Sequence, residues 1–437
     1  MRSPFVRLAV VVALAFPALG AAQAPDAGPQ AISLDDAVRQ AQANSWQTVQ
    51  ARSASRVADA NFKSAVAAFL PSLSVGQSAY HSGGAIFLQG SLIPTSSQWS
   101  YSKGYSVGLT LFDGGARFLN YAAARANLAA ADQNQVIQRY AIALNVKEAY
   151  FAVLEAREAE AAADQQLAEA NEQLAVTQAK VAGGSLSRAE SLTSAVAAGQ
   201  AKLAVITAQG SLVTANAALS RLVGGTREVT AMPADTALVP TISLDSATLE
   251  KLVLEGPSVR QAARLVDADR SSRWAAITRY LPSFGVGYSY SRYYASDHFM
   301  IGGGSLVNNH TLYYFANYSL FDNFQREANV ITASANADNA RAQLRDARLA
   351  ARENLAQYLA QFRTAQQTID LQRLTIESAE ENVAAEDAKY RAGAAALVDV
   401  LTAQTALATA RQNLIQARLN ARTAKAQIEA IIGKDLE

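Results

Sequence analysis

Side chains that could carry out catalysis are scarce in this chain. Its 437 residues include three histidines, His81, His298 and His310, and no cysteine. A thiol nucleophile and a cysteine-based zinc site are therefore excluded. No serine and carboxylate stand out as partners of these histidines in a triad, and the Gly302–Gly304 run is not followed by the Lys-Ser/Thr of a phosphate loop. We expect a protein that is not an enzyme and that needs no cofactor and no metal.

The charge balance is close to neutral. The chain has 38 Lys and Arg against 37 Asp and Glu, and 50% of its residues are hydrophobic. A nucleic-acid partner would require a basic face, which this balance does not suggest. Length alone would predict two or three globular domains.

The N-terminus has the three parts of a secretory signal peptide. Arg2 and Arg7 precede or flank an apolar run from about Leu8 to Phe16, and small residues follow. We predict a signal peptide over residues 1–24, with cleavage between Gly20 and Ala24, and no lipid anchor because no cysteine follows. A membrane anchor is the alternative. After this segment we expect no apolar run to approach the length of a helix that spans a bilayer, about 18 residues.

The rest of the chain reads as two copies of one unit. Four motif pairs recur about 210 residues apart in the same order, as an internal duplication requires. The pairs are FLPSLSVG at Phe69 with YLPSFGVG at Tyr280, ISLDDAV at Ile32 with ISLDSAT at Ile242, LTLFDGG at Leu109 with YSLFDNF at Tyr318, and LVGG at Leu222 with IIGK at Ile431. We predict a first repeat over 25–225, a linker over 226–241 and a second repeat over 242–437.

Each repeat contains two segments with the alternation of a β-strand. The predicted strands cover 72–80 and 100–112 in the first repeat, and 283–293 and 311–321 in the second. In the second of these, Tyr105, Val107 and Leu109 alternate with small residues such as Gly104 and Ser106. Strands that are apolar on one face and small or polar on the other are typical of a transmembrane β-barrel wall. The alternative is a half-buried strand of a soluble sandwich, but no other sheet is predicted. We expect 81–99 and 293–310 to be loops.

Two very long helices follow the strands. Residues 116–182 and 326–391 are predicted to run for roughly 100 Å each, at 1.5 Å per residue. Apolar residues recur every seven positions, with Leu355, Phe362 and Ile369 as an example, and a line of alanines accompanies them in the first copy. This period predicts left-handed coiled coils. Helices over 189–222 and 396–432 are predicted to return along half of each long helix.

Four strands cannot close a barrel. Only closed barrels span a membrane, because an open edge leaves backbone groups without partners in lipid. Since the smallest membrane barrels have eight strands, several copies must pool their strands. The sequence thus predicts a mixed α and β membrane protein with four transmembrane strands per chain.

The signal peptide, the LPS and LFDGG motifs at the strand ends and the YRAGAAALVDVL turn at Tyr390 resemble the TolC-like outer membrane efflux proteins. The resemblance implies a homotrimer with a 12-stranded barrel in the lipid of a Gram-negative outer membrane, continued by an α-helical tunnel in the periplasm. It also implies docking to a periplasmic adaptor and to an inner-membrane transporter of the RND, ABC or MFS type, for export of small toxic compounds or proteins. The alternative is a structural or adhesive trimeric coiled coil without a channel.

The resemblance assigns roles to the two helical turns. Asp399 matches an aspartate that lines the narrow periplasmic end of the tunnel, although Thr402 stands where relatives have a second aspartate. Capping of a helix start is the alternative for Asp399. Tyr390 and Glu190 match a latch pair between hairpins, while Ala395 replaces a latch arginine; packing alone is an even alternative for Tyr390. The residues implied to contact the adaptor are Gly183, Gly184, Ser185, Leu186, Arg391, Gly393 and Leu397.

Overall fold

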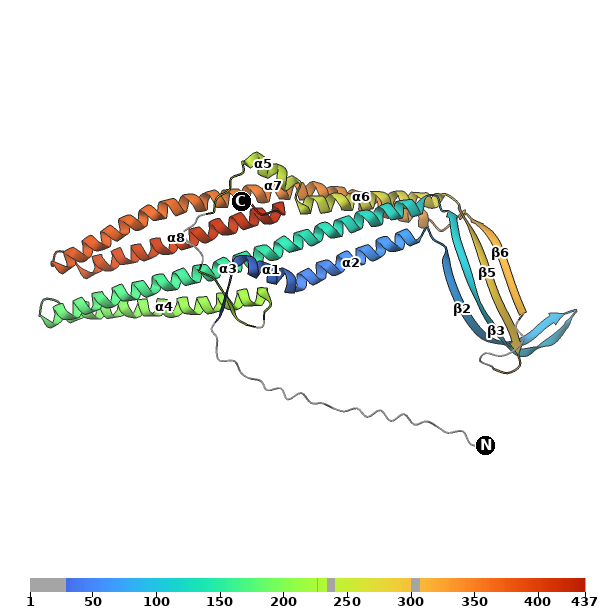
Figure 1. The fold of residues 1–437 in the computed structure, drawn as a ribbon, viewed down its shortest axis with the longest axis horizontal. Coiled ribbons are helices and arrows are strands. Elements are labelled where there is room, and N and C mark those ends of the chain that lie inside the picture. Colours follow the sequence, from blue (N-terminus) through green and yellow to red (C-terminus); the bar gives the residue numbers. More distant parts are fainter. Residues whose placement is uncertain (1–28, 226, 234–239, 300–306, 437) are drawn as a thin grey trace, which may run out of the picture.

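The computed structural model describes residues 29–225, 227–233, 240–299 and 307–436. The predicted signal peptide, Gly302–Gly304, and residues 226 and 234–239 of the predicted linker lie outside the described residues. Figure 1 shows long helices that run side by side and end in a curved antiparallel sheet. The expected architecture of long paired helices continued by a four-stranded sheet is confirmed.

The first half of the chain arranges three helices around one long one. α1 (Leu34–Asn44) and α2 (Trp46–Ala67) precede the sheet, α3 (Ala116–Ala182) leaves it, and α4 (Arg188–Val223) returns. α2 packs on the part of α3 near the sheet, and α4 packs on the part near the opposite end (Figure 1). The long helix is thus covered along its length by two shorter ones.

The second half repeats this plan. α5 (Ser246–Leu254), α6 (Pro257–Ile277) and a short 3-10 turn (Thr278–Tyr280) precede the sheet, and α7 (Gln325–Arg391) and α8 (Leu397–Ile432) follow it. α6 and α8 pack on α7, and both also contact α3, which joins the halves. α3 and α7 have 67 residues each, and α4 and α8 have 36 each. Equivalent positions therefore differ by 209, as Ala116 and Gln325 do.

The predicted seven-residue pattern forms the buried seams between the helices. Val146, Val153, Phe362 and Ile369 are buried, and so are several of the alanines on the accompanying line. Beside the middle of α3, β1 (Gln30–Ile32) pairs in parallel with β4 (Val229–Ala231). These strands and α1 cover a core cluster on α3.

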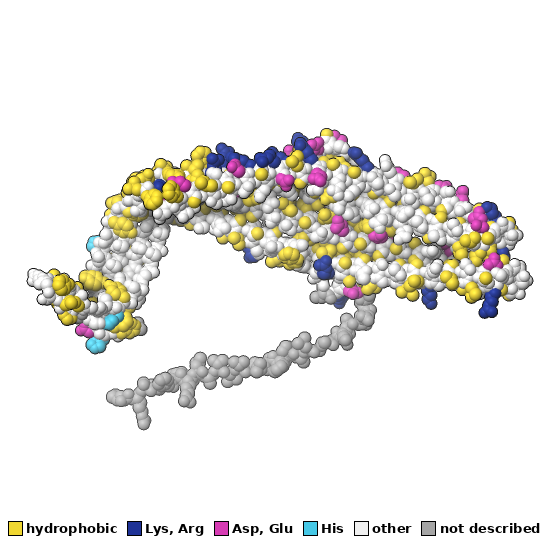
Figure 2. Space-filling view, turned by 180° about the vertical axis from the view of Figure 1, so that it is seen from behind, with side chains coloured by type: hydrophobic (Ala, Val, Ile, Leu, Met, Phe, Trp, Pro, Cys, Tyr) yellow, Lys and Arg dark blue, Asp and Glu magenta, His cyan; other side chains and the backbone are white. Residues whose placement is uncertain are grey.

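The four longer strands form one antiparallel sheet in the order β2 (Ser72–Leu88), β3 (Ser91–Phe112), β5 (Ser283–Ser296) and β6 (Val307–Asn317). Its register separates the two faces as the alternation predicts: Val107 pairs with Tyr288, whereas Ser106 pairs with Ser289. A hollow in the sheet is lined largely by small residues, including Ser74 and Gly76. Figure 2 shows charged side chains over the helical part, whereas the visible face of the sheet is mostly white between yellow patches.

The expectation of a loop over residues 81–99 is wrong. β2 and β3 continue through it as a hairpin whose turn consists of Gln89 and Gly90, with φ angles of 50° and 83°. Two central residues with positive φ match the turn geometry of a two-residue hairpin. Gly83, Gly84 and Pro94 resemble loop residues, but they lie within the paired strands or at a bulge.

The last predicted strand is also corrected. β6 ends at Asn317 rather than at 321, and it begins at Val307, within the segment predicted as a loop. Asn323 and Phe324 have positive φ angles and turn the chain into α7. The Asp322 carboxylate accepts a hydrogen bond from the backbone N–H of Arg326 at 3.1 Å, so the residues after 317 build the start of the helix instead of extending the strand.

The expectation that no segment after the signal peptide is long and apolar enough to span a membrane is wrong, as judged by length and composition. Among the described residues one helix, α4, is long and apolar enough to cross a membrane. Its apolar side chains are mostly exposed in the single chain, as Leu203 and Val213 illustrate. α4 nevertheless packs along α3 within the helical part. Its exposed apolar face is therefore available for contact with another surface beside α3.

Candidate functional site

The candidate site lies at the end of the molecule farthest from the sheet, where both helical hairpins turn. In the α3–α4 turn, the Ser185 N–H donates to the Lys180 carbonyl at 3.0 Å, and Gly184 has a φ of 76°. In the α7–α8 turn, the Ala394 N–H donates to the Lys389 carbonyl at 2.8 Å, and Gly393 has a φ of 79°. The positive φ angles explain the glycines without any partner.

The residues assigned to adaptor contacts divide into two groups. Gly183, Gly184, Ser185, Arg391 and Gly393 are exposed at the two turns. Leu397, in contrast, is 4% exposed and packs with Tyr390 and Val400, and half-buried Leu186 packs against the same cluster. The two leucines therefore hold the first hairpin against the second within one chain, and Leu397 offers almost no surface to a partner.

Tyr390 is the centre of this contact between hairpins. Its side chain is 3% exposed, and its hydroxyl lies 3.2 Å from Thr177 Oγ1. Ser194 of α4 donates to the same Thr177 oxygen at 3.1 Å. The Lys180 ammonium lies 4.2 Å from the centre of the Tyr390 ring and donates to the Tyr390 carbonyl at 2.6 Å. One aromatic residue of α7 thus joins α3 and α4.

Glu190 does not meet Tyr390 within the chain. Its carboxylate accepts a hydrogen bond from the backbone N–H of Ser187 at 3.0 Å, and the Ser187 hydroxyl accepts one from the Glu190 N–H at 3.4 Å. This reciprocal pair is a capping box at the start of α4. The single chain therefore shows a helix cap at Glu190, and the Tyr390–Glu190 latch between hairpins remains a prediction.

Asp399 lies in the first turn of α8. Its carboxylate accepts a hydrogen bond from the backbone N–H of Ala396 at 3.0 Å. Such a contact satisfies a free N–H group at the helix start, as the alternative interpretation expects. The side chain is nevertheless exposed, and so is Thr402 one turn later. Capping fixes the position of the carboxylate and leaves it accessible to solvent.

Sequence reasoning missed the partners of Tyr390. Thr177 follows Ala149, Ala156, Ala163 and Ala170 at the same seven-residue spacing, so a polar residue interrupts the alanine line near the tip. That interruption was the available signal. A second missed contact is the ion pair of Arg391 with Glu172 of α3, at 3.1 Å. Because both groups are about half-exposed or more, we assign it little stabilisation.

A pair of neighbouring carboxylates on α3 gives a pH-dependent prediction. Partial burial, and then the charge of Glu158, raise the pKa of Glu155 above its ordinary value. Ionised Glu155 therefore destabilises the folded state at neutral pH, and protonation relieves this as pH falls through the raised pKa. We expect Glu155→Gln to melt at a higher temperature than wild type at pH 8, with the difference vanishing toward pH 4. Exposed Glu353→Gln is the control, and a pH-independent difference would contradict the explanation.

The described residues contain no group of three His, Asp or Glu side chains that could hold a metal ion. At the α3–α4 and α7–α8 turns, called the tips below, the described side chains do not bring together a nucleophile, a base and an orienting acid. The arrangement instead places exposed turns, one exposed carboxylate and a buried aromatic contact at one end of long paired helices.

Comparisons with known proteins agree with this geometry. A family model described as "Outer membrane efflux protein" matches residues 37–225 and 248–434. No curated protein matches the chain. Among solved structures, one of CusC is 19% identical with a TM-score of 0.81, covering 93% of this chain and 94% of that chain. VceC from Vibrio cholerae is 19% identical with a TM-score of 0.77, over 92% and 97%. MtrE from Neisseria gonorrhoeae, in an open state, is 18% identical with a TM-score of 0.75, over 92% and 89%.

Proposed function

Because the chain belongs to the outer membrane efflux protein family, we propose that three copies form a channel-tunnel through which small toxic compounds or secreted proteins leave a Gram-negative cell. The sheet would sit in the outer membrane and the helices would extend into the periplasm. The signal peptide over residues 1–24 would direct export and be removed.

The observation that carries this proposal is a four-stranded sheet with two open edges. β2 and β6 lie at the edges, and their outer sides pair with no strand among the described residues. In lipid such edges must be paired, and pairing β6 of one copy with β2 of the next closes a barrel. Three copies would supply 12 strands, and the small residues in the hollow of each sheet, such as Ser74 and Ser106, would face a water-filled bore.

The helical tips would meet the rest of an export system. Exposed Gly183, Gly184, Ser185, Arg391 and Gly393 would contact a periplasmic adaptor, which in turn binds an inner-membrane transporter of the RND, ABC or MFS type. The transporter would supply the energy for export, and docking would open the tips.

Conductance tests this function directly. Purified protein inserted into planar bilayers should give discrete ion-conducting steps, and its size in detergent should be that of three chains. A structural or adhesive trimer without a channel would have the same size but would conduct no ions. A protein that stayed a single chain and did not conduct would refute the proposal.

Asp399 gives a sharper prediction for the channel. Three copies would bring three exposed carboxylates toward one constriction, favouring cations. We expect Asp399→Asn to reduce the cation-to-anion permeability ratio several-fold, measured from reversal potentials in planar bilayers under a salt gradient. Thr402→Asp, which adds a carboxylate one turn away, should change the ratio in the opposite direction and strengthen block by divalent cations. Equal selectivity of all three proteins would restrict Asp399 to helix capping.

A further inference from the structure

Two basic side chains lie opposite each other on neighbouring strands of the sheet. Lys103 of β3 pairs with Arg292 of β5, and directly opposite residues share a face of the sheet, with Cβ atoms roughly 5 Å apart. Two residues along each strand, Tyr105 and Tyr290 form the next pair on that face, and their ring centres lie 5.3 Å apart. Lys103 and Arg292 therefore project from the aromatic face of the sheet, opposite its serines and glycines.

No carboxylate accompanies this basic pair. The described strands β2, β3, β5 and β6 contain no Asp or Glu, and Lys103 and Arg292 are their only Lys or Arg residues. Within the described residues neither side chain forms a hydrogen bond or an ion pair, and the Nε of Arg292 is buried without an acceptor. Like charges directly opposite each other destabilise a sheet. The described part of the chain therefore offers no contact that compensates for this pair.

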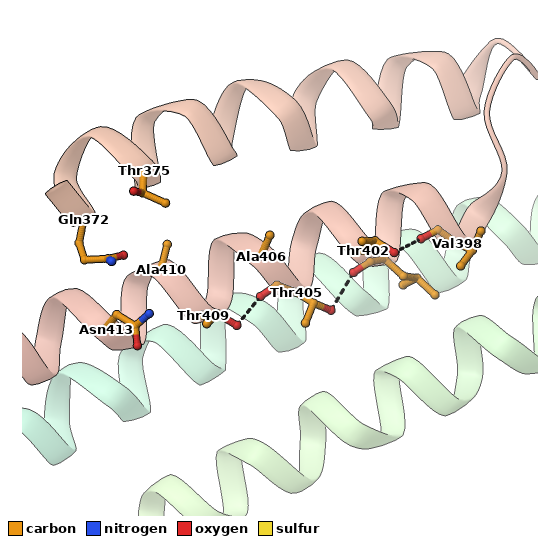
Figure 3. A pocket seen from close by; sticks show the side chains of 10 residues that line it. Gln372, Thr375, Val398, Thr402, Thr405, Ala406, Thr409, Ala410 and Asn413 are labelled. Atoms are coloured by element: carbon orange, nitrogen blue, oxygen red, sulfur yellow. Dashed lines mark hydrogen bonds between the residues drawn. The ribbon is translucent and has the colours of Figure 1, made fainter.

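The polar surface of the helical part is different. There Arg411 forms ion pairs with two carboxylates, those of Glu169 and Glu380. The groove between α7 and α8, part of which Figure 3 shows, is lined by neutral side chains such as Thr402 and Asn413. Neither arrangement leaves a cation free for an anion. The sheet, in contrast, places two cations side by side without a counter-charge.

The basic pair marks the level at which the aromatic face stops being apolar. On β5 this face begins at Phe284 and stays apolar or aromatic up to Tyr290, and Arg292 comes next. The eight residues from Phe284 to Arg292 span roughly 27 Å along a strand, or about 20 Å across a membrane at a strand tilt of about 40°. Since the apolar band of a barrel wall is about 25 Å tall, Arg292 lies near its edge.

Aromatic residues flank the basic pair on both sides along the strands. Below it are Tyr105 and Tyr290, and above it Tyr101 pairs with Tyr294, with ring centres 6.2 Å apart. Aromatic residues form such girdles at the boundaries between lipid and water. The basic pair lies toward the hairpin end of the sheet, which points away from the helices (Figure 1). In the proposed channel this end faces the outside of the cell.

The side chains around the pair supply the donors that a phosphate group requires. The guanidinium group of Arg292 can bind two phosphate oxygens at once, and the Lys103 ammonium adds a mobile point charge. Asn308 of β6 pairs with Arg292, and its side-chain oxygen accepts a hydrogen bond from the Tyr290 hydroxyl at 3.3 Å. That bond leaves the amide N–H groups of Asn308 available as further donors.

We propose that Lys103 and Arg292 bind the phosphate group of a lipid head group in the outer leaflet, from the lipid side of the barrel wall. The inference rests on the proposed function, which provides the lipid boundary at this level. The phosphate would neutralise the two like charges, and the acyl chains would lie along the apolar face below, over Val107 and Tyr288. Each copy of the chain would provide one such site.

Lipid binding to the purified protein tests this site. Lipid A, which carries phosphate groups on a sugar head, is titrated into the protein in detergent, and bound lipid is counted by native mass spectrometry. Lys103→Gln combined with Arg292→Gln should weaken binding about 30-fold, from the attraction that each cation contributes near an anionic lipid. Lys103→Arg keeps the charge and should bind as wild type does.

The matched control removes a cation at the other end of the sheet. Arg279 is exposed in the 3-10 turn that precedes β5, so Arg279→Gln should leave the affinity for lipid A unchanged. An equal loss in this control and in the double variant would reduce the effect to net charge and contradict the site.

Two further ligands distinguish a lipid from a free anion. Lipid A without its phosphate groups should bind wild type as weakly as lipid A binds the double variant. Inorganic phosphate, at the concentration at which lipid A saturates the protein, should not displace the lipid, because it lacks acyl chains. Displacement by inorganic phosphate would show that the pair binds a free anion and would overturn the lipid assignment.

Conductance and size separate this inference from the proposed function. If wild type conducts and has the size of three chains, but lipid A binds wild type and the double variant equally, the lipid site is wrong and the channel stands. Lys103→Gln alone alters one exposed side chain and should give an intermediate loss even if the double variant does not assemble. A protein that neither conducts nor exceeds one chain in size would remove the proposed function and the lipid boundary together.

Discussion

Replacing Tyr390 by alanine is expected to open the periplasmic end of the channel and to lower the free energy of unfolding by about 3–5 kcal/mol, as for other large-to-small aromatic changes in a core. The ring is 3% exposed and packs with Leu397 and Val400. Its hydroxyl and carbonyl bind Thr177 and Lys180 of the other hairpin. The substitution would remove the apolar contact and the side-chain hydrogen bond that hold the two tips together.

The expected result is a larger resting conductance in planar bilayers, and greater sensitivity of cells to an antibiotic too large for an intact outer membrane. Tyr390→Phe keeps the packing and removes the hydroxyl, so it should cost only about 1 kcal/mol and give a smaller leak. Conductance and sensitivity equal to wild type in Tyr390→Ala would show that the tips are held closed by other contacts.

Glu190 allows the predicted latch between hairpins to be tested on hairpins of neighbouring copies, and to be distinguished from the helix cap within a chain. If Glu190 of one copy binds Tyr390 of the next, Glu190→Gln should increase the leak in wild type but add nothing to Tyr390→Phe. The capping role of Glu190 at Ser187 predicts instead the same loss of stability in both backgrounds. Such a double-mutant comparison measures the coupling of the two residues.

The sequence predicts which side chains share a face of the sheet better than it predicts how long the strands are. Alternation places Val107 and Ser106 on opposite faces correctly, because side-chain direction has a strict period of two along a strand. The hairpin over 81–99 escapes the prediction because its glycines are typical of loops and its ends carry no alternating polar pattern. In this segment the backbone pairing of β2 with β3 extends both strands up to the turn. The composition of the segment does not reveal such pairing.

The candidate site shows the same limit. The glycines at 184 and 393 mark both turns, because they take the positive φ that other residues avoid. Tyr390 is recognisable as a residue of the turn, but its partner Thr177 lies on another helix. The repeat locates equivalent residues and says little about which of them meet. The apolar face of α4 is a further case, since a hydrophobic line alone does not reveal whether its cover is the same chain, another copy or lipid.

Removing the Glu429 carboxylate is the second change with a large expected effect. Glu429→Ala should lower the free energy of unfolding by about 3–5 kcal/mol, the usual cost of leaving one partner of a buried ion pair alone. The Glu429 side chain is 8% exposed and the Lys147 side chain 18%. The second Glu429 oxygen accepts a hydrogen bond from the Leu436 N–H at 3.2 Å. The substitution thus isolates the Lys147 ammonium and also frees the C-terminal segment.

Chemical denaturation of the purified protein, followed by helical circular dichroism, measures this loss. Glu250→Ala is the matched control, because it breaks the exposed pair with Arg352 and should cost no more than about 1 kcal/mol.

Further variants test whether the unpaired charge causes the loss. Asp435 lies 3.5 Å from the Lys147 ammonium, so adding Asp435→Asn to Glu429→Ala should deepen the loss of stability. Replacing Glu429 by leucine together with Lys147 by methionine should recover most of it, because the cost arises from a charge without a partner rather than from a missing attraction. If the Glu429→Ala and Glu250→Ala variants had equal free energies of unfolding, the contact between α3 and α8 would depend on apolar packing instead of charge.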